Sequence, residues 1–255
     1  MMNVNHKKKI AAIIECRMTS TRLPGKVMLM SCGKTMLEHL AERLSRVTAI
    51  DEIIFATTTN STDDCIETLA EKISVRCFRG DEEDVLKRVL LAAETYKTDI
   101  IVEVTGDCPL VDPSIVAQTI ELYRVNACDY ASNDLTPSFP LGMDVQVFSR
   151  DLLSIAHEKG RTAPDREHVS WYFIRHPDRF RLVTLPAPPH LYAPGVRLTL
   201  DEEADYRLID AIFTALYEKN PGFDLADMLG YLKAHPEVAA MNAHIVQRHP
   251  SRNEE

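Results

Sequence analysis

Short apolar runs alternate with amphipathic segments through the first half of the chain. The runs at 9–16, 51–59, 75–80 and 99–107 have no helical spacing and contain many β-branched residues, which predicts buried strands. Between them, apolar positions recur at helical spacing at 35–47, 62–74 and 81–96, where we expect helices. This alternation predicts parallel strands joined by right-handed crossovers in a doubly wound α/β sheet. Ligands of such sheets bind outside the carboxyl ends of the strands.

The pattern becomes less regular after a further helix predicted at 113–125. Two prolines and a glycine predict a loop over 137–142, followed by a strand at 143–149 and a helix at 150–158. We also expect a helix over 166–177, strands at 180–188 and 195–201, and long helices from Glu202 onward. No clean linker interrupts the sequence, so we predict one domain over 9–246, between tails at 1–8 and 247–255.

Two helix starts carry signals of their own. Thr62 is expected to be the N-cap of the helix at 62–74. Four acidic residues at 81–84 open the next helix, where the helix dipole favours negative charge. Histidines 39 and 157 lie on amphipathic helices, and we interpret both as surface residues.

Composition and charge argue against several classes of protein. The chain has 255 residues, of which 45% are hydrophobic and 26% charged, as in an ordinary globular protein. Its formal charge of −9 argues against a general nucleic-acid or anionic-membrane surface. No apolar run approaches the roughly 20 residues that span a bilayer, and the polar, basic N-terminus does not resemble a signal peptide. The six cysteines form neither a C-x-x-C pair nor a zinc-spaced cluster, which favours a reduced, cytoplasmic protein.

Positive charge nevertheless gathers in one loop, "CRMTSTRLPGK" at 16–26, directly after the first predicted strand. Its basic residues Arg17, Arg22 and Lys26 can pair with phosphate oxygens, and the small residues among them let backbone N–H groups approach a ligand. The Gly-Lys-Thr at 33–35 lacks the earlier glycine of a Walker A loop and predicts a turn and helix N-cap instead. A solvated basic loop is the alternative, but three such residues at a strand's carboxyl end favour a phosphate site.

Two aspartates follow predicted strands and are candidate metal ligands. Asp107 ends the strand at 99–107, and Asp201 ends the one at 195–201. Judged alone, either one is equally well explained as a turn residue. Two strand-end carboxylates that share one Mg²⁺ would explain both, and Asp112 and Asp144 are weaker candidates.

Few other residues suggest chemistry of their own. His168, beside Glu167, is a candidate substrate contact, although a lone histidine is more often structural. The aromatic run at 171–173 is more typical of a core or a subunit contact than of a stacking platform. No Ser/His/Asp or Cys/His arrangement can be assembled from the sequence.

Several motifs together resemble a known family. "RMTSTRLPGK" followed by "GKTMLEHL" is similar to the signature of the cytidylyltransferases that activate acidic sugars. "FRGDEEDVLKR", "TGDCPLVDP", "GMDVQVFS", "REHVSWY" and "RLTLDEEADY" resemble the SpsF branch of that family, which belongs to spore coat polysaccharide biosynthesis. The resemblance implies a Rossmann-like nucleotidyltransferase of the glycosyltransferase-A type, a three-layer fold with a mostly parallel central sheet. It also implies Mg²⁺ dependence and a homodimer, with 9–125 as the nucleotide-binding half and 126–246 as the sugar-facing and dimerisation half.

The resemblance also implies roles for individual residues. The triphosphate would be held by Arg17, Ser20, Arg22 and Lys26, with Lys26 near the α-phosphate. The rest of the nucleotide would be bordered by Thr57, Thr58, Asn60, Arg79, Gly80 and Thr105. Asp107 and Asp201 would hold Mg²⁺, and the sugar would face Asp144, Gln146, Glu167 and His168. The branch often has an acid where this chain has Gln146, so that contact differs here.

The expected reaction transfers CMP from CTP to a sugar, in surface polysaccharide or glycoconjugate biosynthesis, and releases pyrophosphate. The sugar would be an acidic 2-keto sugar. Lys26, Arg22 and Asp107 would be the catalytic residues, because positioning and charge neutralisation supply most of the catalysis in such transfers. Three alternatives stay open: a nucleotidyltransferase for a sugar or polyol phosphate, a glycosyltransferase-like nucleotide-sugar-binding protein, and a non-catalytic binding module.

Overall fold

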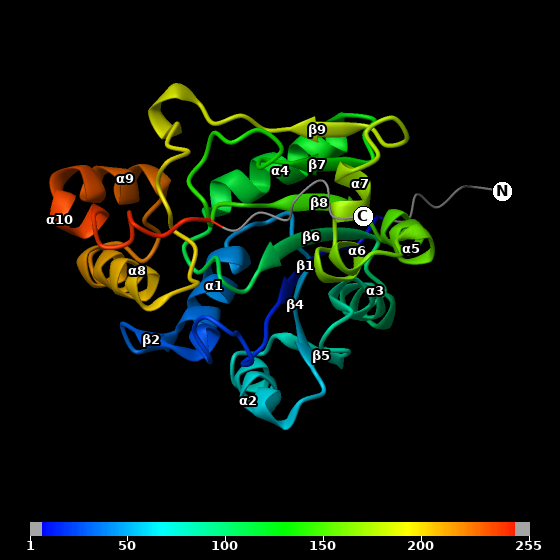
Figure 1. The fold of residues 1–255 in the computed structure, drawn as a ribbon, viewed down its shortest axis with the longest axis horizontal. Helices are drawn as coiled ribbons and strands as arrows, with labels where there is room; N and C mark the ends of the chain where they lie inside the picture. Colours follow the sequence, from blue (N-terminus) through cyan, green and yellow to red (C-terminus); the bar gives the residue numbers. More distant parts are fainter. Residues whose placement is uncertain (1–6, 248–255) are drawn as a thin grey trace.

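The computed structural model describes residues 7–247, which fold around one central sheet (Figure 1). Every strand pair in this sheet is parallel except those of β8, which runs antiparallel to both of its neighbours. The seven strands lie in the order β5 (Arg76–Gly80), β4 (Glu52–Thr58), β1 (Ile10–Glu15), β6 (Ile100–Thr105), β8 (Gln146–Ser149), β7 (Tyr130–Ser132) and β9 (Leu182–Thr184). The predicted three-layer α/β fold with a mostly parallel sheet is therefore confirmed.

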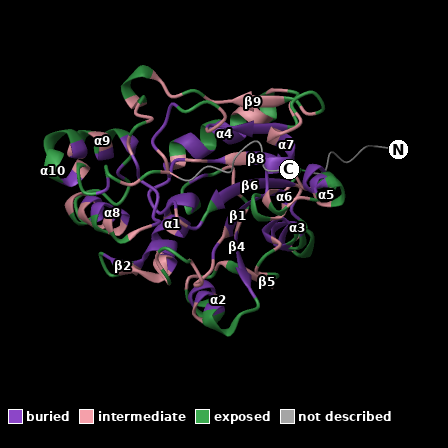
Figure 2. Ribbon diagram, in the orientation of Figure 1, coloured by how far each residue is buried: buried purple, intermediate pink, exposed green. Residues whose placement is uncertain are grey.

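Helices cover both faces of the sheet, because successive residues of each strand point to opposite sides. In β1, Ile14 packs toward α1 (Met36–Ser45), α2 (Asp64–Lys72) and α4 (Pro113–Val125). Its neighbour Ile13 packs toward α3 (Val85–Thr95), α5 (Arg150–Lys159) and α7 (Trp171–Ile174). Figure 2 shows the central strands β1, β4 and β6 mostly buried between these two layers. A third cluster joins Leu198 and Leu200 to α8 (Glu203–Leu216), α9 (Leu225–Ala234) and α10 (Pro236–Ala239).

The first half of the chain agrees closely with its apolar pattern. The strands and helices expected there are all present, and α4 has the predicted bounds. Gly33 lies in the turn between the short strands β2 (Met30–Ser31) and β3 (Lys34–Thr35) and takes a left-handed φ of 77°. Thr35 Oγ1 accepts a hydrogen bond from Glu38 N at 3.0 Å, as expected of an N-cap.

Two helix starts differ from their predictions. Thr62 does not cap α2, because a 3₁₀ turn, η2 (Ser61–Asp63), precedes that helix and contains it. The acidic residues at 81–84 precede α3, and Asp84 is its N-cap, accepting from Lys87 N at 3.0 Å. The interpretation of His39 as a surface residue was also wrong, since its ring is buried and stacks on Phe213 at 4.0 Å between centroids.

The second half contains the larger corrections. The helix expected over 166–177 is broken, because α6 (Ala163–Glu167) ends before an extended His168 and α7 starts at Trp171. The break lets Val169 enter the core. The segment 195–201 is not a strand and has a single bridge, Leu141 to Arg197.

Strands β7 and β8 also differ from the prediction. The sequence pattern gave no signal for β7. Strand β8 starts at Gln146 instead of 143, because Val145 N donates to the Asn133 side chain at 2.8 Å and so leaves the ladder. The aromatic run at 171–173 is buried, as a core role requires.

The structure describes the two predicted tails only in part. Residues 1–6 and 248–255 of the predicted tails lie outside the described residues, whereas Lys7 pairs with Asp51 at 2.7 Å. One sheet crosses both predicted halves of the domain, and the division at 125 stays a prediction. Within residues 7–247, no helix has the length and apolar character needed to span a bilayer.

Candidate active site

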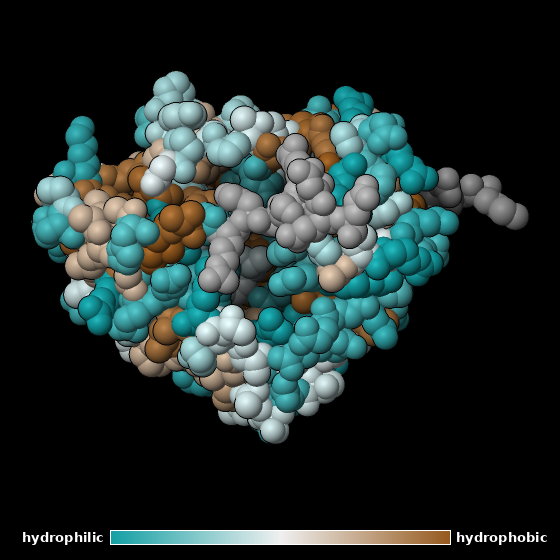
Figure 3. Space-filling model, viewed as in Figure 1, coloured by the Kyte–Doolittle hydropathy of each residue, from teal (hydrophilic) through white to brown (hydrophobic). Residues whose placement is uncertain are grey.

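A cleft of about 290 Å³ lies at the carboxyl ends of β1 and β6. Figure 3 shows that this face is hollowed near its centre, where the arrow of β6 points in Figure 1. Two glycines permit the local geometry. Gly25 takes a left-handed φ of 72° and donates to Met18 O at 2.8 Å, which closes the basic loop on itself. Gly106 donates to Glu15 O at 2.8 Å, and any side chain there would collide with that same oxygen.

Lys26 lies at the centre of the cleft, between the two predicted metal ligands. Its Nζ is 2.8 Å from Asp107 Oδ2 and 2.9 Å from Asp201 Oδ1. Arg22 donates to the same Asp201 oxygen at 2.7 Å. Burial alone would lower the pKa of Lys26, but Asp107 and Asp201 outweigh it, so the pKa is raised and the ammonium stays charged. Burial likewise opposes ionisation of Asp107, but Lys26 lowers the pKa of its carboxyl below the ordinary value.

Asp201 is held from behind by a buried network that sequence reasoning missed. Arg197 donates to Asp201 Oδ2 at 2.8 Å and to Asp205 Oδ1 at 2.9 Å, and all three residues are buried. Asn242, near the end of the described chain, donates to Asp205 Oδ1 at 2.8 Å. The regular spacing of Arg197, Asp201 and Asp205, four residues apart, was the only local signal for this network.

The donor set at this point fits a hard divalent cation. Asp107 and Asp201 come from different loops, yet both bind one ammonium, so their oxygens converge. The described residues contain no group of three or more Asp, Glu, His or Cys side chains placed to bind an ion. Two protein carboxylates suit Mg²⁺, which usually keeps waters and takes its other oxygens from substrate phosphates.

Two of the predicted nucleotide contacts, Thr57 and Thr58 on β4, form hydrogen bonds within the protein. Thr57 and Thr58 are fully buried, and both hydroxyls donate to Asp63 Oδ2, at 2.8 and 2.6 Å. Their hydroxyls are therefore engaged within the fold, and their place beside the nucleotide stays a prediction. Asp63, which the sequence did not single out, also accepts from Met18 N at 2.9 Å and so ties the basic loop to β4.

The remaining predicted nucleotide contacts near β4 and β5 either contact Glu82, in the acidic segment 81–84, or point away from the cleft. Arg17 and Asn60 both contact the Glu82 side chain, with Arg17 Nη1 at 3.5 Å from Oε1. Arg79 donates to Asp64 at 2.7 Å, toward α2 and away from the cleft. Gly80 ends β5, and its carbonyl accepts from Thr59 N at 3.0 Å.

The cleft wall brings together residues from five separate segments. It includes Ser20, Thr105, Glu167 and His168, beside the basic loop and Asp107. Thr105 Oγ1 donates to Asp107 Oδ1 at 2.6 Å. Arg88, which sequence reasoning also missed, is buried in this wall and donates to Ala56 O at 3.2 Å and Glu82 O at 3.1 Å.

Asp144 and Gln146 lie farther along the sheet, beyond β6. Gln146 donates to Asp134 Oδ2 at 3.2 Å, and Asp144 Oδ2 accepts from Gly142 N at 3.4 Å. Asp112 is not part of this region, because it caps α4 and accepts from Leu225 N at 2.7 Å.

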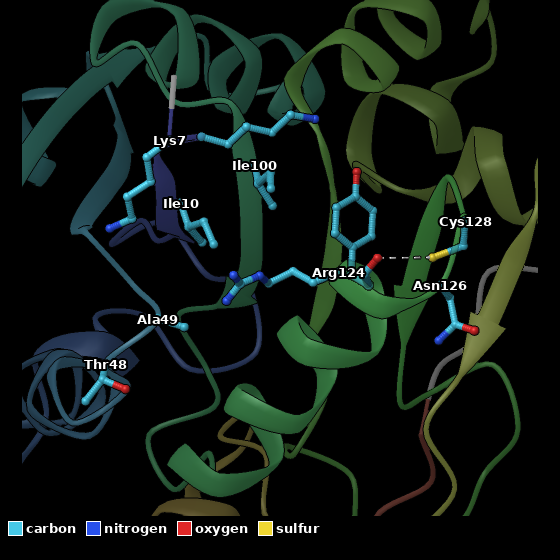
Figure 4. Close-up of a pocket in the computed structure, with 10 residues that line it drawn as sticks. Lys7, Ile10, Thr48, Ala49, Ile100, Arg124, Asn126 and Cys128 are labelled. Carbon is cyan, nitrogen blue, oxygen red and sulfur yellow. Dashed lines mark hydrogen bonds between the residues drawn. The ribbon is translucent and has the colours of Figure 1, made fainter. Parts of the chain in front are cut away.

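A larger cavity, of about 710 Å³, lies at the opposite edge of the sheet (Figure 4). It lies beside the first residues of β1 and β6, Ile10 and Ile100, and Lys7 and Arg124 form part of its wall. Among the described residues that line it there is no carboxylate able to bind a metal. Because ligands of such sheets bind at the carboxyl ends of the strands, the smaller cleft is the better candidate.

Known proteins resemble the chain over nearly its whole length. The family described as Cytidylyltransferase matches residues 11–233. The spore coat polysaccharide biosynthesis protein SpsF of Bacillus subtilis is 33% identical over 235 residues, which cover 90% of this chain and 96% of that protein. A solved cytidylyltransferase structure from Leptospira borgpetersenii superposes with a TM-score of 0.87 at 31% identity, covering 95% of this chain and 100% of that one.

A more distant likeness covers part of the chain. The 3-deoxy-manno-octulosonate cytidylyltransferase of Pelobacter propionicus is 38% identical over 116 residues, which are 44% of this chain and 43% of that protein.

Proposed function

We propose that this chain, which belongs to the cytidylyltransferase family, transfers CMP from CTP to an acidic 2-keto sugar and releases pyrophosphate. The acceptor class is supported by the partial likeness to a 3-deoxy-manno-octulosonate cytidylyltransferase. The likeness to SpsF supports a place in the biosynthesis of a surface polysaccharide or glycoconjugate. We further propose that the enzyme is a cytoplasmic homodimer that depends on Mg²⁺.

The observation that carries the proposal is the sharing of Lys26 between Asp107 and Asp201. The ammonium neutralises both carboxylates in this structure. When a triphosphate enters, Lys26 can turn to its oxygens, and the two carboxylates are then free to hold a cation. Mg²⁺ bound there would neutralise phosphate charge and orient the acceptor oxygen.

The chain's own residues position and neutralise the reacting groups. An acceptor hydroxyl oxygen forms a bond to the α-phosphorus of CTP, the bond from that phosphorus to the bridging β-phosphate oxygen breaks, and the hydroxyl proton leaves to solvent. Lys26 and Arg22 would stabilise the charge that develops on the departing pyrophosphate. The paired carboxylates keep both cations ordered before the substrate arrives, which lowers the cost of reorganisation.

Pyrophosphate release tests this proposal. The protein is incubated with CTP, Mg²⁺ and 3-deoxy-manno-octulosonate, and the product is identified by mass spectrometry. Lys26→Ala and Asp107→Ala should each lower release by about 100-fold or more. Lys72→Ala, on the exposed face of α2, should leave it unchanged. Release unaffected by the first two substitutions would contradict the site assignment.

Nucleotide preference is tested separately by thermal shift. CTP should raise the Tm more than ATP, GTP or UTP at equal concentration, because binding to the folded state adds to its stability. Equal shifts with all four nucleotides would contradict CTP as the donor.

A further inference from the structure

Four carboxylates have no cation partner within the described residues; one of them, Glu15, lines the cleft, and the other three follow it across β6, β8 and β7. They are Glu15, Glu103, Asp134 and Asp144, and together we call them the acid cluster. None of them takes part in an ion pair, whereas Asp107 and Asp201 a short distance away are both paired.

The strand register brings the acid cluster together. Glu103 on β6 lies opposite Gln146 on β8, which in turn lies opposite Ser132 on β7. Asp134 follows β7 and accepts from both the Gln146 amide and the Ser132 hydroxyl. On the other side of Glu103, the end of β1 supplies Glu15, whose charge acts directly on Glu103.

The floor of the cluster is an unpartnered buried carboxylate. Glu103 is 4% exposed, and its Oε2 has no hydrogen-bond partner among the described residues. Gln146 Oε1 is also shielded from solvent and unpartnered within that part of the chain. In contrast, Glu15, Asp134 and Asp144 are half-buried, so the cluster can be reached from outside. All of these groups present hydrogen-bond acceptors.

An uncompensated group of this kind is costly without a partner. Burying a carboxylate with neither a cation nor a hydrogen bond is strongly unfavourable, and such groups respond by taking up protons. Burial and then the neighbouring Glu15 raise the pKa of Glu103, and burial raises that of Asp134. Burial, with the charge of Asp134, raises the pKa of Asp144 to about 7. Burial therefore favours the protonated forms of Glu103 and Asp144, and a cationic ligand would replace those protons.

We propose that the acid cluster binds a protonated amino group on the acceptor sugar, so the preferred acceptor is an amino sugar. This rests on the proposed function, because it concerns the acceptor side of the same cleft. The sheet order supports the placement, since β4 and β5 lie on the opposite side of β1 from β6, β8 and β7. A nucleotide held by the basic loop therefore has the acid cluster on its acceptor side.

An ammonium group fits the cluster better than a metal ion or a sugar hydroxyl. No three of the described acidic, His or Cys side chains are placed to bind a metal ion, which disfavours a metal site at the cluster. An ammonium offers three hydrogen-bond donors to the unpartnered oxygens of Glu103 and Gln146 and carries the missing positive charge. A neutral hydroxyl offers one donor and leaves the charge of the cluster uncompensated.

Paired acceptors test the inference. The probes are 3-deoxy-manno-octulosonate and analogues in which one hydroxyl at a time is replaced by a primary amine, with the N-acetylated form of each amine as an uncharged control. Binding is measured by calorimetry on protein saturated with CTP in the absence of divalent cations, and turnover is then measured with Mg²⁺. At least one amine should bind about 10-fold or more tightly than its hydroxyl and acetamido partners, as expected for a hydrogen bond to a charged group.

Substitutions in the cluster locate the effect. Glu103→Gln and Asp134→Asn keep the shapes of their side chains and remove their charges. The double variant should bind amine and hydroxyl acceptors about equally, while CTP still raises its Tm. Glu121→Gln, on the exposed surface of α4, is the matched control and should keep the preference.

The possible outcomes distinguish the inference about the amino group from the proposed function. CTP binding with no amine bound more tightly than its hydroxyl partner overturns the inference and leaves the proposed function standing. Competition between the amine and Ca²⁺ at the cluster, abolished by Glu103→Gln, would instead indicate a metal site and overturn it as well. Loss of CTP binding and of CMP transfer to every acceptor would count against the proposed function itself.

Discussion

The carboxylates on the two sides of the cleft differ in whether a cation is bound to them. Around the basic loop, Asp107 and Asp201 are bound to Lys26, and Arg197 supports Asp201 from behind. Across β6, the carboxylates of the acid cluster have no cation among the described residues, and burial raises the pKa of Glu103 and of Asp144. The first side is ordered before a ligand arrives, because its charges already satisfy one another. The second side has no such pairing, and its negative charges lie next to one another.

The largest expected effect comes from removing the shared cation on the balanced side. Lys26→Ala should lower the rate of pyrophosphate release by about 10²–10³-fold, because it removes a charged donor at the developing negative charge. Rates are measured at saturating CTP, with Lys72→Ala as the control. A loss confined to KM for CTP would assign Lys26 to ground-state binding only.

Arg197 should matter most for stability. Arg197→Ala leaves Asp201 and Asp205 buried without their partner and should lower the free energy of unfolding by about 3–5 kcal/mol. Denaturant unfolding measures the change. Arg207→Ala removes an exposed ion pair with Glu203 on α8 and should cost less than about 1 kcal/mol. Similar losses of unfolding free energy in Arg197→Ala and Arg207→Ala would mean that the buried network contributes little to stability.

Gly106 joins the two sides, so a side chain there should disturb both. In Gly106→Ala the new Cβ would lie 2.8 Å from Glu15 O, a backbone atom that cannot move freely. We expect a loss of about 1–3 kcal/mol in stability, together with slower transfer. Gly195→Ala, where no atom lies within 4 Å, is the control and should be close to neutral. Normal activity and stability in Gly106→Ala would show that the close approach is dispensable.

The smallest effect expected is on the acidic side, and it depends on pH. Because the pKa of Asp144 is raised to about 7 by burial and by Asp134, its ionisation costs the folded state stability as the pH rises toward 7. Asp144→Asn should therefore raise the Tm more at pH 8 than at pH 5, by roughly 2–4 °C for each kcal/mol relieved. Asp151→Asn, at a side chain that is 88% exposed, should have the same small effect at both pH values. A gain for Asp144→Asn that does not change with pH would contradict the raised pKa.

The two sides were not equally readable from the sequence. The basic loop could be found because Arg17, Arg22 and Lys26 lie within ten consecutive residues after an apolar run. The acid cluster could not, because Glu15, Glu103 and Asp134 meet only through strand pairing across the sheet. Glu103 is also a single charge inside an apolar strand, where the run of neighbours predicts burial and gives no reason for the acid.

The parts of the fold that could be predicted are those set by local sequence, and the parts that could not are those set by long-range packing. The α/β order and the bounds of α4 follow from periodicity within each segment. The broken helix near His168 and the irregular path of 195–201 depend on packing against distant parts of the chain. Thr57 and Thr58 were expected to border the nucleotide, yet Asp63 binds both hydroxyls, a pairing that only the three-dimensional turn creates.

The Asn242 contact has a practical consequence for anyone who adds sequence to this protein. Asn242 and Gln247 both touch the Arg197 network, so the end of the described chain lies one side chain away from Asp201. Lys7, at the other end, lies beside Asp51 at the amino edge of the sheet, across the molecule from the cleft. A label that must leave the cleft undisturbed should therefore be attached at Lys7. A fluorophore at position 247 would make a sensor for events in the cleft.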